Sequence, residues 1–458
     1  MDTIETFDAA LQRLNDTPAR PAAPGGVKPK LAVVSTYDEL CGIAAYTLFL
    51  RKQLDKDYDV TVFELDQYLL RNPFARVRKL ADQHIKDICA KLGGFDCVNL
   101  QLEHGTLGRD GKDILRRFKW LMNAAPSVSV TFHTVVPLEP LNRRAFWTKL
   151  LTLRWLSARK MLFDAKQRNL MSAGIYRVLR ATERAKQVSI IVHNRREMRF
   201  MKYVNRFKNV FDHPLAFIAP EDAKAIRAGA RRDRFPQLDG LPPKTKLVCV
   251  FGFFGRYKGF DTAIRALHHL PDDYHLLIFG GVHPNEIKKE EGVYPYVQEL
   301  LDAAYIDKAP VDELKDGISL SIDGSSRDML FTHPKDLSKR VHFMGALGDD
   351  DFLAGMAIAD TVVFPYLEVG QSASGPISQA VELGCRVVAS RTQTFMQFSR
   401  YHADTIEFFE IGNYVDLASR IRSRPVFPPE QRQPKYTTDT NRAVYRAANT
   451  VDVTARSR

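Results

Sequence analysis

The amino-acid sequence predicts an α/β protein with two domains, each built on an open, doubly wound parallel sheet with flanking helices. Three observations support this. The 458 residues exceed what one hydrophobic core ordinarily holds. From Lys30 onward, short apolar runs alternate with longer helical patterns, which is typical of repeated βα units. The alternation weakens over residues 203–243, where five prolines interrupt a charged segment, and then restarts.

The first predicted domain covers residues 30–220. Its strands are apolar nearly throughout, as expected for parallel strands that helices cover on both faces. The predicted strands are 30–36, 59–65, 95–101, 127–133 and 187–193, and helical patterns over 43–54, 75–92 and 112–124 lie between them.

The second predicted domain covers residues 240–423, with strands at 246–252, 274–281, 340–345, 360–365 and 386–390. Residues 283–339 are too many for a simple connection, and we interpret their latter part as an insertion. In such sheets ligands bind at the carboxyl ends of the strands, where loops and helix N-termini converge. We therefore expect the two sheets to face a common cleft.

The two ends of the chain differ from the domains in composition. Residues 1–29 become rich in proline, alanine and glycine, and we expect a flexible leader there. The tail over 424–458 is polar and contains prolines before a segment with some helical character. Whether this tail packs back on the first domain is left open.

Cysteine usage and hydropathy limit the cellular location. The five cysteines are scattered and form no Cys-x-x-Cys pair, which argues against a disulfide framework or a zinc site and favours a reducing compartment. The N-terminus lacks an apolar signal core, and no apolar run approaches the roughly 18 residues needed to cross a bilayer. We expect a cytoplasmic protein, at most attached peripherally to the inner membrane surface.

The formal net charge of +12 is unevenly distributed, because residues 139–187 hold twelve Lys/Arg against three Asp/Glu. Several interpretations remain open. The cations form a solvated helical face, or they contact an anionic membrane or an anionic acceptor. Alternatively, the apolar residues of this segment form an ordinary core stripe with helical spacing; they are Trp147, Leu151, Trp155, Ala158 and Leu162.

Three loops that follow predicted strands carry the chemistry of phosphate binding. Gly42 opens a helix after the first strand, although glycine also suits a tight turn. In FGFFGRYKGFD (251–261), Gly252 is followed by Arg256 and Lys258, two cations ahead of a helix N-terminus. The alternative for this loop is a surface turn with solvated cations.

The third loop lies within PYLEVGQSASGPISQAVELGCRVVAS (365–390). Ser374 and Gly375 lead into Pro376, which suits a first helical turn, and the helix N-terminus then offers unencumbered amides and hydroxyls to a phosphate. An ordinary capped helix is the alternative.

The first domain contributes three further candidates. His133 ends the strand SVSVTFH, where an imidazole can hydrogen-bond a sugar hydroxyl or a developing charge. Glu103 and His104 follow the third strand at a comparable edge, and we assign them to the acceptor side. A histidine satisfied by the backbone is the structural alternative for His133.

Five of these segments, in this order, resemble the GT-B glycosyltransferases of family 4 over roughly residues 30–415. They are CGIAAYT, NLQLEHG, TFHTVV, FGFFGRYKGFDTAIRAL and GQSASGPISQAVELGCRVVAS. The resemblance implies retaining transfer of a hexose from a nucleotide diphosphate sugar to a saccharide, lipid-linked or protein acceptor, as in polysaccharide biosynthesis. It implies no cofactor beyond the donor and no obligatory metal.

The resemblance also implies roles for individual residues. Gly42 approaches the donor phosphates and His133 the donor sugar. Lys258 neutralises the diphosphate leaving group, with Arg256 as a second cation, and Ser374 with Gly375 offers backbone contacts to the same group.

Two departures from the family pattern leave the donor open. Phe253 stands where many members carry an arginine, and Gln371 and Gln379 stand where many carry two glutamates. Glutamine still hydrogen-bonds sugar or ribose hydroxyls but supplies no negative charge. The only Asp-x-Asp candidates, in DKDYD (55–59), precede a strand rather than follow one, which argues against a metal-dependent transferase fold.

Three rival functions remain open. A sugar-nucleotide epimerase uses similar phosphate loops but requires paired acid and base groups around the sugar. A polyanion-binding protein would explain the charge but not the glycine-rich loops, and no nucleic-acid-binding module is recognised. A non-catalytic partner subunit would explain the departures at Phe253, Gln371 and Gln379.

Overall fold

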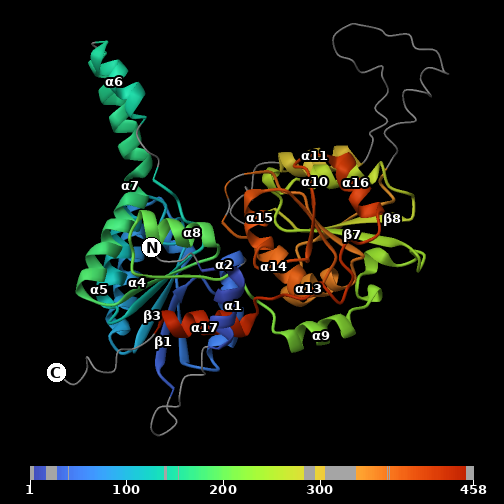
Figure 1. Cartoon of the computed structure of the whole chain (residues 1–458), viewed down its shortest axis with the longest axis horizontal. Helices are drawn as coiled ribbons and strands as arrows, with labels where there is room; N and C mark the ends of the chain where they lie inside the picture. Colours follow the sequence, from blue (N-terminus) through green and yellow to red (C-terminus); the bar gives the residue numbers. More distant parts are fainter. Residues whose placement is uncertain are drawn as a thin grey trace. The chain divides into compact units, whose positions relative to one another are not determined.

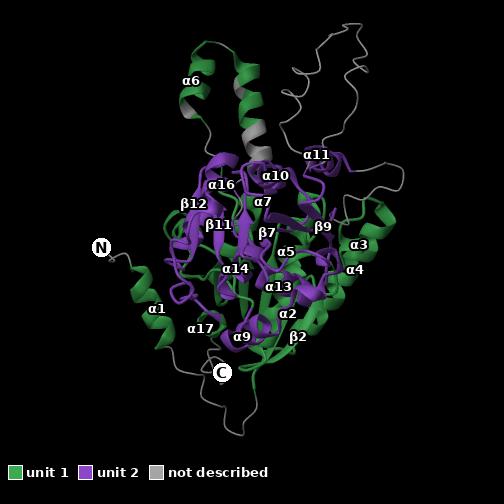
Figure 2. Ribbon diagram, turned by 90° about the vertical axis from the view of Figure 1, so that its right-hand side faces the viewer, with its two compact units in different colours: residues 1–217, 438–458 green, residues 218–437 purple. Residues whose placement is uncertain are grey.

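The computed structural model describes the two compact units of the chain, unit 1 (residues 1–217 and 438–458) and unit 2 (residues 218–437), which Figure 2 distinguishes by colour. The residues described are 5–16, 28–39, 41–138, 142–152, 154–282, 294–304, 337–368, 370 and 372–449. Among these residues, no helix has both the length and the apolar composition needed to cross a membrane.

Unit 1 contains a six-stranded parallel sheet in the order β2-β1-β3-β4-β5-β6. Its strands are β1 (Lys30–Ser35), β2 (Asp59–Glu64), β3 (Cys97–Leu102), β4 (Val128–Phe132), β5 (Val188–Val192) and β6 (Asn209–Asp212). Its helices are α1 (Phe7–Asn15), α2 (Gly42–Leu54), α3 (Gln67–Leu70), α4 (Ala75–Leu92), α5 (Gly111–Ala124), α6 (Arg143–Leu151), α7 (Trp155–Ala185), α8 (Arg195–Arg199) and α17 (Thr438–Ala448), with a π-helical turn at Phe200–Val204. Helices cover both faces of the sheet (Figure 1).

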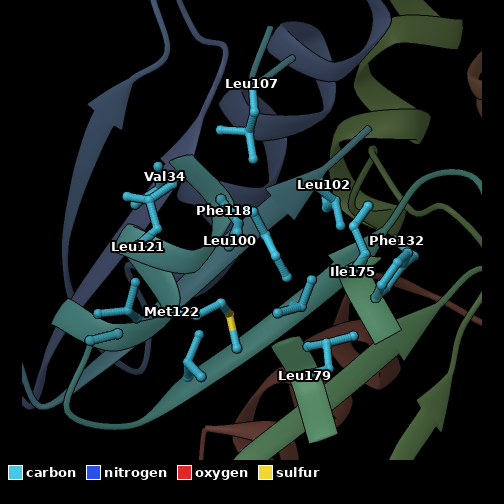
Figure 3. Close-up of a cluster of buried hydrophobic side chains, with 14 of the residues drawn as sticks. Val34, Leu100, Leu102, Leu107, Phe118, Leu121, Met122, Phe132, Ile175 and Leu179 are labelled. Atoms are coloured by element: carbon cyan, nitrogen blue, oxygen red, sulfur yellow. The ribbon is translucent and has the colours of Figure 1, made fainter. Parts of the chain in front are cut away.

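The two faces of the unit 1 sheet differ in polarity because alternate strand residues point to opposite faces. On one face Leu100, Leu102 and Phe132 pack against α5 and α7 in an apolar cluster (Figure 3). On the other face the polar residues Asn99 and Gln101 of β3 bond side chains of β4 and of α17. Buried polar groups of this kind require partners, and α17 supplies several of them.

Unit 2 contains a second six-stranded parallel sheet in the order β12-β11-β10-β7-β8-β9. Its strands are β7 (Lys246–Phe251), β8 (Tyr274–Phe279), β9 (Val341–Gly345), β10 (Thr361–Phe364), β11 (Val387–Ser390) and β12 (Ile406–Phe409). Its α-helices are α9 (Pro220–Gly229), α10 (Phe260–Leu267), α11 (Pro295–Ala304), α13 (Asp349–Ala357), α14 (Gly375–Glu382), α15 (Gln393–Ser399) and α16 (Tyr414–Arg422). Phe260, Ile264 and Leu267 of α10 are buried on one face, as their spacing predicts.

The predicted fold class is confirmed, since both sheets are parallel and flanked by helices. All ten predicted strands are present within two residues of their predicted ends. The sequence reading missed β6 and β12, which are sheet-edge strands of four residues each. Short edge strands carry too few apolar residues to stand out as runs. The predicted insertion falls largely on residues 305–336, which lie outside the described residues.

The N-terminal segment differs from the flexible leader that the sequence predicts over residues 1–29. Part of the expected leader, Phe7–Asn15, is the helix α1, which Thr6 caps. Ala10 and Leu14 are buried, and the Arg195 guanidinium lies 3.9 Å from the centroid of the Phe7 ring. Amphipathic spacing in this short helix explains why it is ordered despite the flexible composition that follows it.

The tail contributes α17 to unit 1, and residues up to 437 belong to unit 2. Arg442 of α17 forms an ion pair with the half-buried Asp57 at 3.0 Å, and Asn441 donates to Gln53 at 2.8 Å. The chain first passes from unit 1 to unit 2 between residues 217 and 218, just before α9.

The core-stripe interpretation of residues 147–162 is wrong, since all four stripe residues with described side chains are exposed, Leu162 by 45 %. Trp147, Leu151 and Trp155 are exposed by 56, 80 and 61 %. In unit 1, α6 and the start of α7 extend beyond the other helices (Figure 1).

Candidate functional site

The loop after β7 folds Lys258 back over the end of its own strand. Gly252 has φ +128°, and a Cβ there would lie 3.1 Å from the Lys258 Nζ. Residues Arg256–Lys258 form a single 3₁₀ turn that ends at Gly259, whose φ is +65°. A side chain at Gly259 would overlap the Pro365 carbonyl oxygen. Both glycines are therefore required for the close approach of this loop to the segment after β10.

Lys258 is buried, with 6 % of the residue exposed. Its ammonium donates to the Tyr366 Oη, and it lies 4.2 Å from the centroid of the Tyr366 ring. Burial lowers the pKa of Lys258, an effect that the neighbouring Tyr257 opposes. In the part of the chain described, no carboxylate forms an ion pair with Lys258. A buried cation without a carboxylate is a position where an anionic ligand is strongly favoured.

Tyr366 connects Lys258 to the N-terminus of α14. Its Oη lies 3.3 Å from the Oγ of Ser374, the residue before the helix. Burial raises the pKa of Tyr366 well above its usual value, so the hydroxyl stays protonated. The residues predicted at 258 and at 374–375 therefore lie close together in unit 2, bridged by one tyrosine hydroxyl.

Ser374 does not cap the helix it precedes. Its backbone is extended, with φ −138° and ψ 120°, and its side chain accepts no hydrogen bond from the first turn. Gly375 and Pro376 form that turn. The amide of Gly375 carries no side chain beside it, and the positive end of the helix dipole lies at this point. The carboxyl ends of β7 and β10 thus present an ammonium, two hydroxyls and a helix N-terminus together.

The other predicted residues of unit 2 lie elsewhere or remain open. Arg256 is exposed, pairs with Glu299 of α11 and lies 5.4 Å from the Tyr296 ring centroid, so the structure does not bring it to Lys258. Gln379 is buried in α14. Gln371 lies outside the described residues. Phe253 is half-buried in the loop after β7.

In unit 1, His133 follows β4 and is half-buried. Its Nε2–H donates to the Gln101 Oε1 at 2.8 Å, which leaves the Nδ1 as an acceptor in the neutral ring. Burial lowers the pKa of His133 to about 4, against the opposing charge of Glu103. The imidazole is therefore neutral at pH 7, and its Nδ1 can accept a hydrogen bond but supplies no charge.

Gln101 is held in turn by residues that the sequence reading missed. Its amide donates to the Asn99 Oδ1 at 2.6 Å and to the Tyr445 Oη at 3.2 Å. The Tyr445 hydroxyl also lies 3.0 Å from the Thr131 Oγ1 and is fully buried. The orientation of His133 thus depends on a tyrosine of α17, more than 300 positions away in the sequence.

Glu103 and His104 lie beside His133 at the end of β3. The Glu103 carboxylate accepts from the Thr134 Oγ1 at 2.8 Å and from the His104 backbone N–H at 3.0 Å. Burial alone would raise the pKa of Glu103, but the hydrogen bonds from His104 and Thr134 outweigh it and lower the pKa. Glu103 is therefore an ionised acceptor in a half-buried setting.

His193 is a further histidine at this edge. It follows β5, and its ring centroid lies 5.1 Å from that of His133. The residue is buried, and its Nε2 has no hydrogen-bond partner among the described residues. Its position at the end of the predicted strand 187–193 was the signal that could have identified it.

Gly42 begins α2, and the Cys41 Sγ accepts from the Ala44 N–H at 3.3 Å as the helix cap. A Cβ at Gly42 would meet no atom within 4 Å, and its φ is not positive. Neither a positive φ nor a close contact therefore requires a glycine at position 42. Among the described residues, no group of three or more His, Cys, Asp or Glu side chains is arranged to hold a metal ion.

No family model and no curated protein matches the sequence. Solved structures of low identity match nearly the whole chain. Sucrose-phosphate synthase from Thermosynechococcus elongatus is 14% identical, with 91% of this chain and 94% of that chain covered and a TM-score of 0.51. A UDP-forming α,α-trehalose-phosphate synthase from Burkholderia xenovorans is 11% identical, with 92% and 96% covered and a TM-score of 0.51. A glycosyltransferase from Rickettsia africae is 12% identical, with 94% and 97% covered and a TM-score of 0.50. The chain therefore has the GT-B fold.

Proposed function

We propose that the protein is a retaining, metal-independent glycosyltransferase of the hexosyltransferase type. It moves a sugar from a nucleotide diphosphate sugar to a saccharide, lipid-linked or protein acceptor. The observation that carries the proposal is the buried ammonium of Lys258, which has no carboxylate partner among the described residues and is linked through Tyr366 to Ser374.

A diphosphate is the anion that this cluster fits best. Lys258 offers one charge, Tyr366 and Ser374 offer hydroxyls, and the Gly375 end of α14 offers backbone amides with the helix dipole behind them. Two adjacent phosphates can engage an ammonium and a helix N-terminus at once. Gly252, which allows the close approach of the loop to Lys258, belongs to the same donor-binding set.

The difficult step is breaking the bond between the anomeric carbon and the diphosphate, because negative charge develops on the leaving oxygen. Lys258 and the α14 N-terminus supply preorganised positive potential for that charge in a site of low polarity, where it is most effective. One such group is worth about 10²–10³ in rate. Arg256 is proposed as a second cation for the phosphates; this requires it to leave Glu299, and its exposure allows that movement.

The unit 1 residues are proposed to recognise the sugars. The Nδ1 of neutral His133 accepts a hydrogen bond from a donor hydroxyl, and Gly42, the first residue of α2, approaches the donor phosphates. Ionised Glu103, with His104, is proposed to accept hydrogen bonds from acceptor hydroxyls. Gln379, and Gln371 beyond the described residues, are proposed to bind donor hydroxyls.

Uridine diphosphate sugars are the first donors to test, since the structurally similar protein from Burkholderia xenovorans is UDP-forming. The purified chain is incubated with UDP-, GDP-, ADP- and dTDP-sugars, with and without a mixture of saccharide acceptors. A transferase releases nucleoside diphosphate in an acceptor-dependent manner, and the product retains the anomeric configuration of the donor.

Three other outcomes would contradict this proposal. Conversion of the nucleotide sugar without any acceptor indicates an epimerase. Thermal stabilisation by a nucleotide sugar without turnover of any acceptor indicates a non-catalytic partner subunit. An inverted product contradicts the retaining mechanism.

A further inference from the structure

The end of the helical hairpin formed by α6 and α7 carries an unusual concentration of exposed apolar side chains. We define the hairpin tip as residues 142–152 and 154–163. Six of the eighteen exposed large hydrophobic residues of the described chain lie in it: Trp147, Leu151, Trp155, Leu156, Leu162 and Phe163. Two of the protein's three tryptophans are among them. Such clusters on otherwise ordinary surfaces indicate interaction sites.

The exposed face of α6 has a defined composition. Trp147 and Leu151 lie four residues apart and are 56 and 80 % exposed, so they form one apolar ridge. Phe146 and Leu150, on the adjacent face of the helix, are only half exposed. The helix therefore presents a tryptophan and a leucine outward while other apolar side chains are partly covered.

The charge of the tip has a single sign. Residues 142–163 contain six Lys/Arg and no Asp or Glu. Three of these cations, Arg144, Lys149 and Arg154, line a hollow of about 540 Å³ together with Thr148 and Thr152. No cation of the described tip forms an ion pair with a described carboxylate. The hollow is thus a basic, hydroxyl-lined surface next to the apolar ridge.

We propose that the hairpin tip docks on an anionic phospholipid bilayer. Trp147, Leu151 and Trp155 enter the interfacial region, and the cations of the hollow contact lipid phosphates. Tryptophan is favoured at the boundary between headgroups and hydrocarbon, and basic residues beside exposed apolar ones are typical of interfacial helices. Lipid headgroups also supply the negative charge that the tip lacks.

A second copy of the chain is a poorer occupant of the same surface. Docking two tips against each other would bring six positive charges of each copy together without a single acidic partner. Like charges brought into contact oppose association. Charge complementarity therefore favours the bilayer. This inference does not depend on the proposed transfer reaction.

The test is flotation of the full chain with vesicles of phosphatidylcholine alone and with vesicles that also contain phosphatidylglycerol. We expect binding only to the anionic vesicles, weakened by salt. The triple variant Arg144→Gln/Lys149→Gln/Arg154→Gln is expected to bind roughly 100-fold more weakly, at about fivefold for each lost cation. The matched control changes three exposed cations of α4, Arg76→Gln/Lys79→Gln/Lys91→Gln, and is expected to bind like the wild type.

Tryptophan fluorescence gives an independent readout. Trp147 and Trp155 lie in the tip, whereas Trp120 of α5 lies beneath Lys86 and Arg116 in the body of unit 1. Anionic vesicles should shift the emission of the wild type to shorter wavelength and leave that of Trp147→Ser/Trp155→Ser unchanged. Three results would overturn the proposal. They are no wild-type binding to anionic vesicles at low salt, equal loss of binding in the α4 control, and self-association that depends on Trp147 and Trp155 in the absence of lipid.

Discussion

Replacing Lys258 by methionine should reduce activity while leaving the stability of the free protein unchanged or higher. The ammonium is buried, burial lowers its pKa, and no described carboxylate compensates its charge. Methionine keeps most of the aliphatic volume and removes the charge. Replacing a buried charge by an apolar group of similar volume is often neutral or stabilising by about 1–4 kcal/mol.

The expected loss of activity follows from the position of the ammonium at the proposed leaving group. Removing one preorganised donor typically lowers turnover by about 10²–10³, which corresponds to about 2.7–4 kcal/mol of transition-state stabilisation. The measurement is kcat at saturating donor, together with the midpoint of thermal unfolding. Tyr366 keeps its hydrogen bond to Ser374, so the loop after β10 should stay in place.

The matched control is Arg265→Met on α10, which removes an exposed cation of the same unit. It should change neither kcat nor the unfolding midpoint appreciably. The reasoning is refuted if Lys258→Met retains wild-type kcat, or if its unfolding midpoint falls as far as expected for loss of a structural ion pair.

Three further predictions follow from the two clusters. Tyr366→Phe removes the hydroxyl between Lys258 and Ser374 and should raise the KM for the donor by up to about tenfold; an unchanged KM would show that this hydroxyl does not contact the donor. Tyr445→Phe removes the hydroxyl that contacts the buried side chains of Thr131 and Gln101. It should lower the free energy of unfolding, measured by urea titration, by about 1–3 kcal/mol. Unchanged stability would contradict a stabilising role of these hydrogen bonds. His213 follows β6, is buried, and its Nε2 lies 2.8 Å from the Oγ1 of Thr440 in α17. Burial lowers the pKa of His133 and of His213 to about 4 from the usual 6.5, so the unfolded chain binds more protons between about pH 4 and pH 6.5. The free energy of unfolding should therefore fall as the pH is lowered from about 6.5 to about 4, by up to about 1.4 kcal/mol per pH unit for each histidine, and His133→Asn should show a shallower fall.

The fold was accessible from the sequence because fully covered parallel strands are continuous apolar runs. That signal located ten strands, and it failed for β6 and β12, where four-residue strands at the sheet edges offer no run of sufficient length. The helix α1 was missed because the proline-rich composition that follows it dominated the interpretation of residues 1–29.

The candidate site was accessible from the sequence only for residues in the loops that follow predicted strands. His133 directly follows β4, while Lys258 and Ser374 were found because they lie in the strand-to-helix loops after β7 and β10; the structure places these two on either side of Tyr366. Tyr366 itself was not identified, since a tyrosine after an apolar strand resembles a core residue.

Partners distant in sequence were not predictable from local patterns. Arg256 lies in the predicted loop, but Glu299 of α11, 43 positions later, determines its direction. Tyr445 reaches Gln101 from α17 across 344 positions. Both contacts depend on tertiary packing, on which spacing within one loop carries no information.

The most direct test of the central claim is the affinity for a nucleoside diphosphate, measured by titration calorimetry for the wild type and for Lys258→Met. UDP, GDP, ADP and dTDP are compared in turn with the corresponding monophosphates. The account predicts that one diphosphate binds the wild type more tightly than its monophosphate. It also predicts that Lys258→Met removes most of this difference and leaves the affinity for the monophosphate nearly unchanged. Equal affinity of both proteins for that diphosphate, or no binding of any of the four diphosphates to the wild type, would contradict the claim that Lys258 and the N-terminus of α14 form a diphosphate site.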